Sequence, residues 1–224
     1  MAAALGVRFT DKRGNSFIPC GETLCDISGI DLSSLDERIA AGSFTVMCDV
    51  DNPLFGISGA AHVYAPQKGA SPEQVKLLDD GLRHYGAVLQ EHFGKTFNEI
   101  PGAGAAGGLG AGCMAYLGAT LKSGIDTLLE LYDFKARCTD ADIVITGEGK
   151  LDTQSFQGKV LSGILREAGN VPVWSICGTC DCDPALLQKH NLTVFEASEG
   201  ISTDESMKYP AKYLRLAAER ALLL

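Results

Sequence analysis

The amino-acid sequence predicts an α/β protein of two domains, the second of them a Rossmann-like parallel sheet. From residue 140 onward, short apolar runs of strand length alternate with segments of helical length, which is typical of successive βαβ units. The 224 residues, 46% hydrophobic and 21% charged, have an ordinary globular composition and enough apolar content to bury a core. We therefore expect an α/β domain with a glycine-rich loop over 1–139 and a Rossmann-like βαβ domain over 140–224.

The first domain is expected to begin directly with secondary structure. Residues 5–9 predict a short strand, and the polar and glycine residues of 10–15 predict a turn after it. Residues 30–38 predict a short helix, because a serine can cap it and acidic residues follow in its first turn. Residues 44–50 stay apolar until the run ends, which predicts a buried strand.

The best-defined element is a helix from Pro72 to about Phe93. Ser71 is a preferred N-cap, proline suits the first helical position, and Glu73 complements the positive end of the helix dipole. Apolar residues recur along the segment at spacings of three and four, so one face is predicted to be buried. That face consists of Val75, Leu78, Leu82, Tyr85, Leu89 and Phe93.

The second half of the chain predicts an alternating series of elements. A helix is expected over 125–131, before the series begins. Strand and helix then alternate, starting with a strand, over 142–146, 153–168, 171–176, 183–190, 192–196 and 208–223. This order implies a parallel, doubly wound sheet.

The charge balance excludes some partners. With 19 basic and 28 acidic residues the formal charge is −9, which argues against binding to nucleic acid or anionic membranes, so local groups must hold any anionic ligand. No run approaches the roughly 18 apolar residues of a membrane span, and the first eight residues do not look like a signal peptide. We expect a cytoplasmic protein with no membrane or nucleic-acid partner.

Eight cysteines are scattered along the chain, and we expect them to be reduced. Cys177 and Cys180 form a C-x-x-C pair, followed by Cys182, so a redox pair or half of a zinc site has to be considered. A second half with matching spacing is missing from the sequence. The alternative is a loop in which these are incidental small residues.

A run of glycines and charges follows directly after a predicted strand. Glu148 and Asp152 can serve a metal ion or a proton, Lys150 can serve phosphate, and Gly147 and Gly149 permit close backbone approach. In open parallel sheets, ligands bind beyond the carboxyl ends of the strands. The run therefore predicts a catalytic or binding site, and the alternative is a tight turn with solvated charges.

Glycine and alanine dominate residues 102–112. The spacing of Gly102, Gly104 and Gly107 matches the dinucleotide fingerprint, but residues 95–101 make a poor strand and no acid-ended strand follows at the required distance. The run also fits a tightly packed helix, or a helix N-terminus whose free amides hold an anion. The glycines expected in such an anion cradle are Gly104, Gly107, Gly108 and Gly110.

Two further segments contribute polar groups. Asp49, Asp51 and Asn52 crowd the end of a predicted strand, where they can bind Mg²⁺, accept a hydroxyl proton or form an Asx turn before proline. Gln67 and Lys68 lie in a loop that ends in glycine, where the lysine can bind phosphate or simply be solvated.

Taken together, four blocks resemble the bacterial type I glycerate kinases in order and spacing. The blocks are residues 49–54, 66–69, 101–110 and 146–152. The resemblance extends over essentially the whole chain. It implies two α/β domains that face each other across a cleft, and ATP- and Mg²⁺-dependent transfer of a phosphoryl group to D-glycerate. The loops would then meet at one anion-binding crevice.

The resemblance also suggests roles. Lys68 and Lys150 would hold phosphate or the substrate carboxylate, and Asp152 would accept the hydroxyl proton. The candidate ligands for Mg²⁺ are Asp49, Asp51 and Glu148. The catalytic set is then Asp152, Lys150 and Glu148, and the expected substrate and nucleotide contacts are Asp49, Asp51, Asn52, Gln67, Lys68, Gly104, Gly107, Gly108, Gly110, Gly147 and Gly149.

About the first third of the family's usual length has no counterpart in this sequence. The Rossmann-like sheet is therefore expected to be partial, and the chain either to be inactive alone or to need a complementing N-terminal fragment. Exposed apolar surface would also favour a homodimer. Two alternatives stay open: a dinucleotide-dependent oxidoreductase that uses Gly102 to Gly107, and a non-catalytic interaction subunit.

Overall fold

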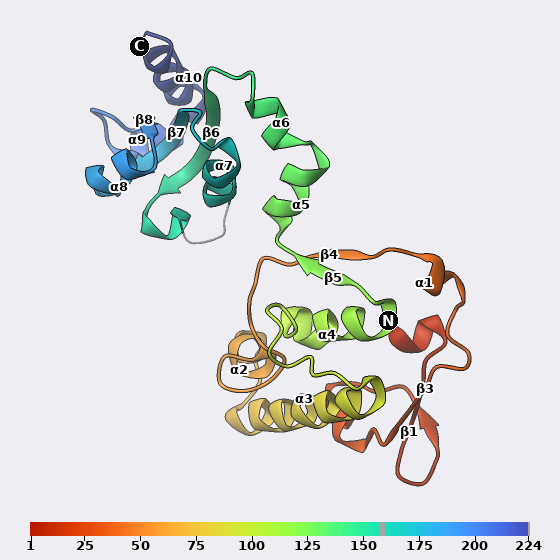
Figure 1. The fold of residues 1–224 in the computed structure, drawn as a ribbon. Helices are drawn as coiled ribbons and strands as arrows, with labels where there is room; N and C mark the ends of the chain where they lie inside the picture. The colour runs from red at the N-terminus through yellow and green to blue at the C-terminus, as the bar shows by residue number, and fades with distance from the viewer. Residues whose placement is uncertain (157–159, 224) are drawn as a thin grey trace. The chain divides into compact units, whose positions relative to one another are not determined.

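The computed structural model describes residues 1–156 and 160–223 and divides into two compact units (Figure 1). Unit 1 is Met1–Ser123 and unit 2 is Gly124–Leu224. Both units combine helices with parallel strands, which confirms the predicted α/β class.

The sequence-based division after residue 139 lies later in the chain than this structural one. Helices α5 (Gly124–Leu131) and α6 (Phe134–Cys138) pack against α7 (Val160–Ala168), and α5 also packs against α6. These contacts group both helices with unit 2. The helix predicted over 125–131 is confirmed as α5.

Unit 1 begins with a small antiparallel sheet in which β1 (Arg8–Thr10) lies between β2 (Ser16–Phe17) and β3 (Gly29–Asp31). The predicted turn after β1 is present, because Asp11 accepts hydrogen bonds from the N–H groups of Arg13 and Asn15, both at 2.8 Å.

Two local expectations at this end of the chain need correction. The strand predicted over 5–9 starts later, because a 3-10 helix, η1 (Ala2–Leu5), occupies its beginning. The helix predicted over 30–38 is wrong, because the first residues of that segment pair with β1 instead. One short turn of helix, α1 (Arg38–Ala41), forms only afterwards.

Helix α3 (Pro72–Phe93) confirms the best-defined element of the sequence. The Ser71 hydroxyl accepts a hydrogen bond from the Gln74 N–H at 3.3 Å, and the Gln74 side chain accepts one from the Ser71 N–H at 2.9 Å. This reciprocal capping satisfies two N–H groups that the helix leaves unpaired. The predicted apolar face is buried or half-buried.

Shorter elements complete unit 1. They are η2 (Gly21–Asp26), β4 (Thr45–Met47), α2 (Ala60–Tyr64), η3 (Pro66–Lys68), α4 (Ala105–Leu117) and β5 (Thr120–Lys122). Strands β4 and β5 pair in parallel, and both η2 and α2 pack against α3. The strand predicted over 44–50 is shorter than expected and is not buried. In the part of the chain that the structure describes, β4 pairs with one strand, and Met47 is 61% exposed.

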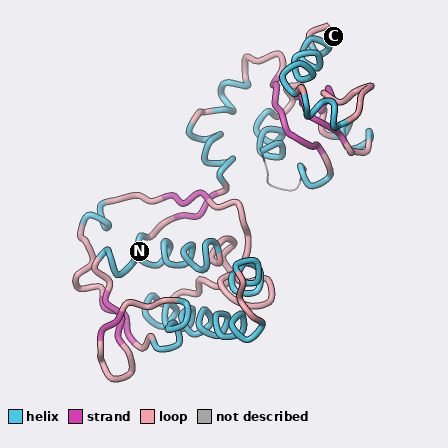
Figure 2. Tube along the Cα trace, turned by 180° about the vertical axis from the view of Figure 1, so that it is seen from behind, coloured by secondary structure: helices cyan, strands magenta, loops and turns pink. Residues whose placement is uncertain are grey.

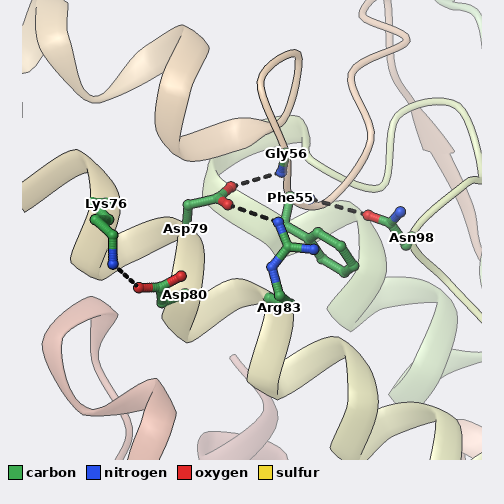
Figure 3. Close-up of polar contacts among 7 residues, drawn as sticks. All are labelled: Phe55, Gly56, Lys76, Asp79, Asp80, Arg83 and Asn98. Carbon is green, nitrogen blue, oxygen red and sulfur yellow. Dashed lines mark hydrogen bonds and ion pairs between the residues drawn. The ribbon is translucent and has the colours of Figure 1, made fainter.

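A buried carboxylate ties the loop after β4 to α3 (Figure 3). Asp79 accepts a hydrogen bond from the Gly56 N–H at 2.7 Å through Oδ1 and one from Arg83 Nη2 at 3.2 Å through Oδ2. The Arg83 guanidinium lies 4.4 Å from the centre of the Phe55 ring. Asn98 Oδ1 accepts a hydrogen bond from the Phe55 N–H at 3.2 Å. Three side chains from two other segments thus fix one short loop.

Unit 2 is built on a parallel sheet with the strand order β6-β7-β8. Its strands are magenta in Figure 2. The strands are β6 (Val144–Leu151), β7 (Val173–Cys180) and β8 (Leu192–Glu196). Helices α7 and α8 (Pro184–Lys189) supply apolar residues to the core on one face, and α10 (Pro210–Ala221) covers β7 and β8 on the other. Helix α9 (Thr203–Lys208) precedes α10 and packs against β7.

The predicted alternation in unit 2 is confirmed, with two differences in extent. Strands β6 and β7 continue beyond the predicted 142–146 and 171–176, because they remain paired to their last residues. The helix predicted over 153–168 is a 3-10 helix, η4 (Thr153–Phe156), followed by α7, and residues 157–159 lie outside the described residues. Among the residues described, no helix has the length and apolar content to cross a membrane.

Replacing the buried Asp79 tests how strongly the loop depends on it. Asp79→Ala is expected to lower the free energy of unfolding by about 1–3 kcal/mol, because the Gly56 N–H loses its partner inside the fold. The matched control is Asp80→Ala, which breaks only the exposed pair with Lys76 and should cost about 0.5 kcal/mol or less. Urea unfolding of both variants measures the difference, and equal losses would contradict this role of Asp79.

Candidate functional site

A cavity of about 450 Å³ in unit 1 brings together residues that are far apart in the sequence. Gln67 and Lys68 of η3 lie on its wall with Gly107 from the start of α4. Val50, which follows β4, lines it too. The remaining wall is mainly apolar and comes from η2, α2 and α3: Gly21, Leu24, Ala60, Ala61, Tyr64, Leu78 and Leu82. An apolar cavity with a few polar groups has the form of a small-molecule site.

The chain enters α4 through three consecutive residues with left-handed backbone conformation. Ala106, Gly107 and Gly108 have φ angles of 50°, 73° and 97°. Glycine adopts this conformation at no steric cost. Alanine can adopt it only with strain, because its Cβ lies too close to the backbone. A Cβ at Gly107 would meet no atom within 4 Å, so this residue presents open backbone to the cavity.

The other glycines of the run serve packing. A Cβ at Gly108 would lie 3.0 Å from the Leu54 side chain, and at Gly104 or Gly110 it would overlap the carbonyl oxygen of Pro53 or Gly102. Gly104 and Gly110 let one backbone segment lie directly on another, whereas Gly108 leaves room for the side chains of Leu54 and Leu82. Their structural role is clear, and their predicted ligand contacts remain predictions.

The structural context does not favour the dinucleotide fingerprint. Residues 98–104 are turns, and the described strand nearest before them in sequence is the short β4. A dinucleotide fold needs a strand that leads straight into the glycine loop.

Of the acidic block before the loop, Asn52 has a structural role. Its Nδ2 donates to the Ser58 carbonyl oxygen at 2.8 Å, and its Oδ1 accepts from the Tyr64 hydroxyl at 2.6 Å. Asn52 therefore positions Tyr64, which lines the cavity. Asp49 and Asp51 are exposed and flank Val50, and they remain predicted ligands.

In unit 2, the run of glycines and charges that was expected to follow a strand is itself a continuation of β6. Glu148 and Lys150 pair with Cys177 and Thr179 of β7. A Cβ at Gly147 would lie 3.0 Å from the Ile176 carbonyl oxygen, which shows that this glycine admits the neighbouring strand. The alternative of a tight turn is therefore wrong, because the strand continues to Leu151 and Asp152 is the first residue after it.

The charged residues of this strand differ in their surroundings. Glu148 Oε2 is buried and has no hydrogen-bond partner among the described residues. Lys150 lies 3.6 Å from Asp181 in an exposed ion pair, which contributes little to stability. Asp152 caps the following turn by accepting a hydrogen bond from the Gln154 N–H at 2.9 Å. A buried carboxylate oxygen without a partner is costly, and a proton or a cation would relieve that cost.

Cysteine chemistry is not favoured at the end of β7. Burial, followed by the nearby Cys180 and Glu196, raises the pKa of the Cys177 thiol to about 12. Burial and then Cys180 raise the pKa of Cys182 to about 11. Thiols that stay protonated at neutral pH are poor nucleophiles. The interpretation of these cysteines as incidental small residues fits the structure better.

Within the part of the chain that is described, no three His, Cys, Asp or Glu side chains converge as a metal-ion site. Mg²⁺ usually takes only one or two carboxylates and completes its shell with water and substrate phosphates. Glu148, with one buried oxygen that has no partner among the described residues, remains a predicted ligand.

Sequence reasoning missed the residues that support the unit 1 cavity. Tyr64, Asp79, Arg83 and Asn98 were not singled out. One signal was present: Asp79 is four residues after Val75 and three before Leu82, on the apolar face of α3. An acid at such a position has to be paired.

Comparison with known proteins gives consistent matches. The model of the family described as "Glycerate kinase family" matches residues 1–224. The chain is 39% identical over 222 residues to a glycerate kinase of Bacillus subtilis, and 40% identical over 212 residues to a glycerate 2-kinase of Escherichia coli. These matches cover 97% and 93% of the chain but 58% and 56% of the relatives. The chain thus spans little more than half of their length.

A solved structure is also similar. It is a crystal structure of a putative glycerate kinase 2 from Salmonella typhimurium LT2, with a TM-score of 0.77 and 34% sequence identity. The match covers 100% of this chain and 61% of that one.

Alkylation tests the assignment of the thiols. At about pH 8, iodoacetamide should modify Cys20 well before Cys177, because only thiolates react. Cys20 is exposed, and its hydrogen bond with Thr23 lowers its pKa, whereas Cys177 is buried with a pKa of about 12. Peptide mass spectrometry over a time course gives both rates. Faster modification of Cys177 would show that the end of β7 holds a reactive thiol after all.

Proposed function

Because the chain belongs to the glycerate kinase family, we propose that it carries out ATP-dependent phosphoryl transfer to D-glycerate. The structural observation that supports this most directly is the unit 1 cavity, in which Gln67, Lys68 and Gly107 share one wall. The Lys68 ammonium and the open backbone at Gly107 lie beside the apolar wall of the cavity. This combination suits a ligand that has both a phosphate group and an aromatic base.

Phosphoryl transfer requires positioning and charge stabilisation more than covalent help from the protein. We assign Lys68 and the backbone at Gly107 to phosphate oxygens in unit 1. In unit 2 we assign Lys150 to a phosphate or to the substrate carboxylate, and Asp152 to the proton of the attacking hydroxyl. Asp152 follows the last residue of β6, and the carboxyl ends of parallel strands are where such sheets hold their ligands.

Mg²⁺ is expected to accompany ATP, and its role is to neutralise charge on the phosphate oxygens. Glu148 is our first candidate to hold it, because one of its oxygens is buried without a partner among the described residues. Asp49 and Asp51 are the further candidates, both exposed after β4.

One relative is named for phosphorylation at position 2 of glycerate. We propose the same product for this chain. The oxidoreductase alternative is not favoured, because the glycine run follows turns and because its glycines serve packing.

A coupled assay tests the activity and its position together. The chain is incubated with ATP, Mg²⁺ and D-glycerate, and the product is passed to enolase without phosphoglycerate mutase. Phosphoenolpyruvate is expected, because enolase accepts the 2-phosphate directly. Appearance of product only after mutase is added would indicate the 3-phosphate. Absence of ADP release, both alone and with the unmatched part of the Bacillus subtilis relative supplied, would refute the proposed activity.

Lys68→Met tests the unit 1 cavity within that assay. Loss of the cation from the wall is expected to lower kcat/KM by about 100-fold, since an electrostatic contact to phosphate is lost while the apolar stem remains. Lys76→Met is the matched control, since Lys76 pairs only with Asp80 on the exposed side of α3 and should leave kcat/KM unchanged. Equal effects of the two substitutions would remove Lys68 from the site.

Glu148→Gln separates function from stability in unit 2. It keeps the shape of the side chain but removes the charge, so kcat is expected to fall by about tenfold or more while Tm stays the same or rises. Tm does not fall because an unpartnered buried carboxylate oxygen is destabilising. Glu22→Gln, an exposed residue of η2, controls for the loss of one negative charge. A lower Tm with unchanged kcat would show that Glu148 has a purely structural role.

A further inference from the structure

A second cavity in unit 1, of about 190 Å³, is lined by residues of α3 and α4. These two helices lie side by side in the unit (Figure 1). Tyr85 of α3 and Tyr116 of α4 form part of the wall, and Phe9, Leu24 and Ile27 add apolar side chains from β1 and the region of η2. An apolar cavity of about 150 Å³ already holds benzene, so this one has space for a molecule with a single ring.

The chemistry of this wall favours a neutral ligand. Among the described residues that line the second cavity, no side chain is charged. A charged molecule would therefore lose its hydration without gaining a counter-charge. Ile18 and Leu109 also line the cavity and are 80% and 46% exposed, so they mark the place where it opens to solvent.

Two tyrosine hydroxyls give the wall its polar side-chain groups. The Tyr85 hydroxyl donates to the Tyr116 hydroxyl at 2.9 Å, and both residues are buried. A pair of hydroxyls has two protons, and the bond between them uses one. In the described part of the chain, no hydrogen bond takes up the Tyr116 proton. A buried donor without an acceptor is costly.

Both hydroxyls keep their protons at neutral pH. Burial raises the pKa of Tyr85 to about 12. Burial, followed by the nearby Tyr85, also raises the pKa of Tyr116. The Phe9 ring makes a T-shaped contact with the Tyr116 ring, with the ring centres 6.0 Å apart. The pair therefore offers one spare O–H donor on a ring that is held by packing.

We propose that the second cavity binds a small neutral molecule with a single-ring apolar body and one acceptor oxygen. The oxygen takes the spare Tyr116 proton, and the apolar body fills the rest of the cavity. Water alone fits this wall less well, because a buried water needs two to four polar partners. The site is separate from the Lys68 and Gly107 wall and does not depend on the proposed phosphoryl transfer.

The two cavities of unit 1 share part of their walls. Leu24 lines both, while Gly108 lines the second cavity and Gly107 lines the first. Both glycines belong to the left-handed segment at the start of α4. A ligand that packs against Gly108 restrains this segment. Binding in the second cavity is therefore expected to stabilise the backbone that Gly107 presents to the first.

Titration with two probes tests the site in the 224-residue chain. Acetophenone has a ring and an acceptor oxygen, and ethylbenzene has a similar shape without the acceptor. Affinities are measured from amide shifts in NMR spectra of the labelled protein. Both probes are expected to bind. Benzoate, which has the same ring and a negative charge, is expected to bind more weakly than acetophenone.

A double substitution tests the hydrogen bond. Tyr85→Phe combined with Tyr116→Phe keeps both rings and removes both hydroxyls, so acetophenone should bind about fivefold more weakly while ethylbenzene loses no affinity. The matched control is Tyr132→Phe combined with Tyr209→Phe, at positions that are 62% and 45% exposed. This control should leave the affinity for both probes unchanged.

Two further measurements locate the ligand. Gly112→Leu places a side chain in the cavity, since a Cβ there meets only the flexible Met1 side chain, at 3.7 Å, and it should abolish binding of both probes. Circular dichroism checks that the variant is folded, and the double tyrosine variant decides the proposal if it is not. Hydrogen exchange over residues 106–109 should slow when acetophenone binds to the wild-type chain.

Four outcomes would overturn the proposal. One is a wild-type spectrum that acetophenone leaves unchanged, which would leave water as the occupant. Another is an equal loss of affinity for acetophenone and ethylbenzene in the double tyrosine variant. Tighter binding of benzoate than of acetophenone would contradict a neutral ligand. Binding without slower exchange over residues 106–109 would contradict the link between the two cavities.

Discussion

Direct contact of main chain with main chain at glycines is the constraint on which both units depend. A side chain at Gly104 or Gly110 would overlap a carbonyl oxygen of the segment beneath it, and one at Gly178 would overlap the carbonyl oxygen of Gly149. No rearrangement of flexible side chains relieves such a clash, because the atoms in the way are backbone. Glycine at these positions allows α4 to lie against the loop after β4, and β6 to lie against β7 up to their last residues.

This packing creates the unit 1 cavity. The start of α4 rests on residues 52–54, so that Gly107 faces the wall formed by α2 and η3. The loop beneath is held in turn by buried polar contacts, with Asp79 and Asn98 as the acceptors. Backbone groups inside a fold have to be paired, and a loop that is paired by side chains of two neighbouring segments is held in one conformation. The polar groups of the cavity are therefore placed by rigid supports.

On one side of the unit 2 sheet, in contrast, a strand lies uncovered. Helices cover both faces of β7, whereas β6 has an open edge in the described part of the chain and an exposed isoleucine. The chain also spans little more than half of the length of its relatives.

The sequence by itself determined the elements that depend on local chemistry. The capped helix α3, the helix α5, the alternation of strands and helices in unit 2 and the α/β class all follow from caps, periodicity and turn residues. The family resemblance was also readable from four blocks of residues, and the family match confirms it. Only the tertiary structure decided what the glycines do, where β6 ends and that Asn52 holds Tyr64. The physical reason is that a glycine which turns the chain and a glycine which admits a neighbouring backbone have the same local sequence signal. They differ only in what lies within a few ångströms in space.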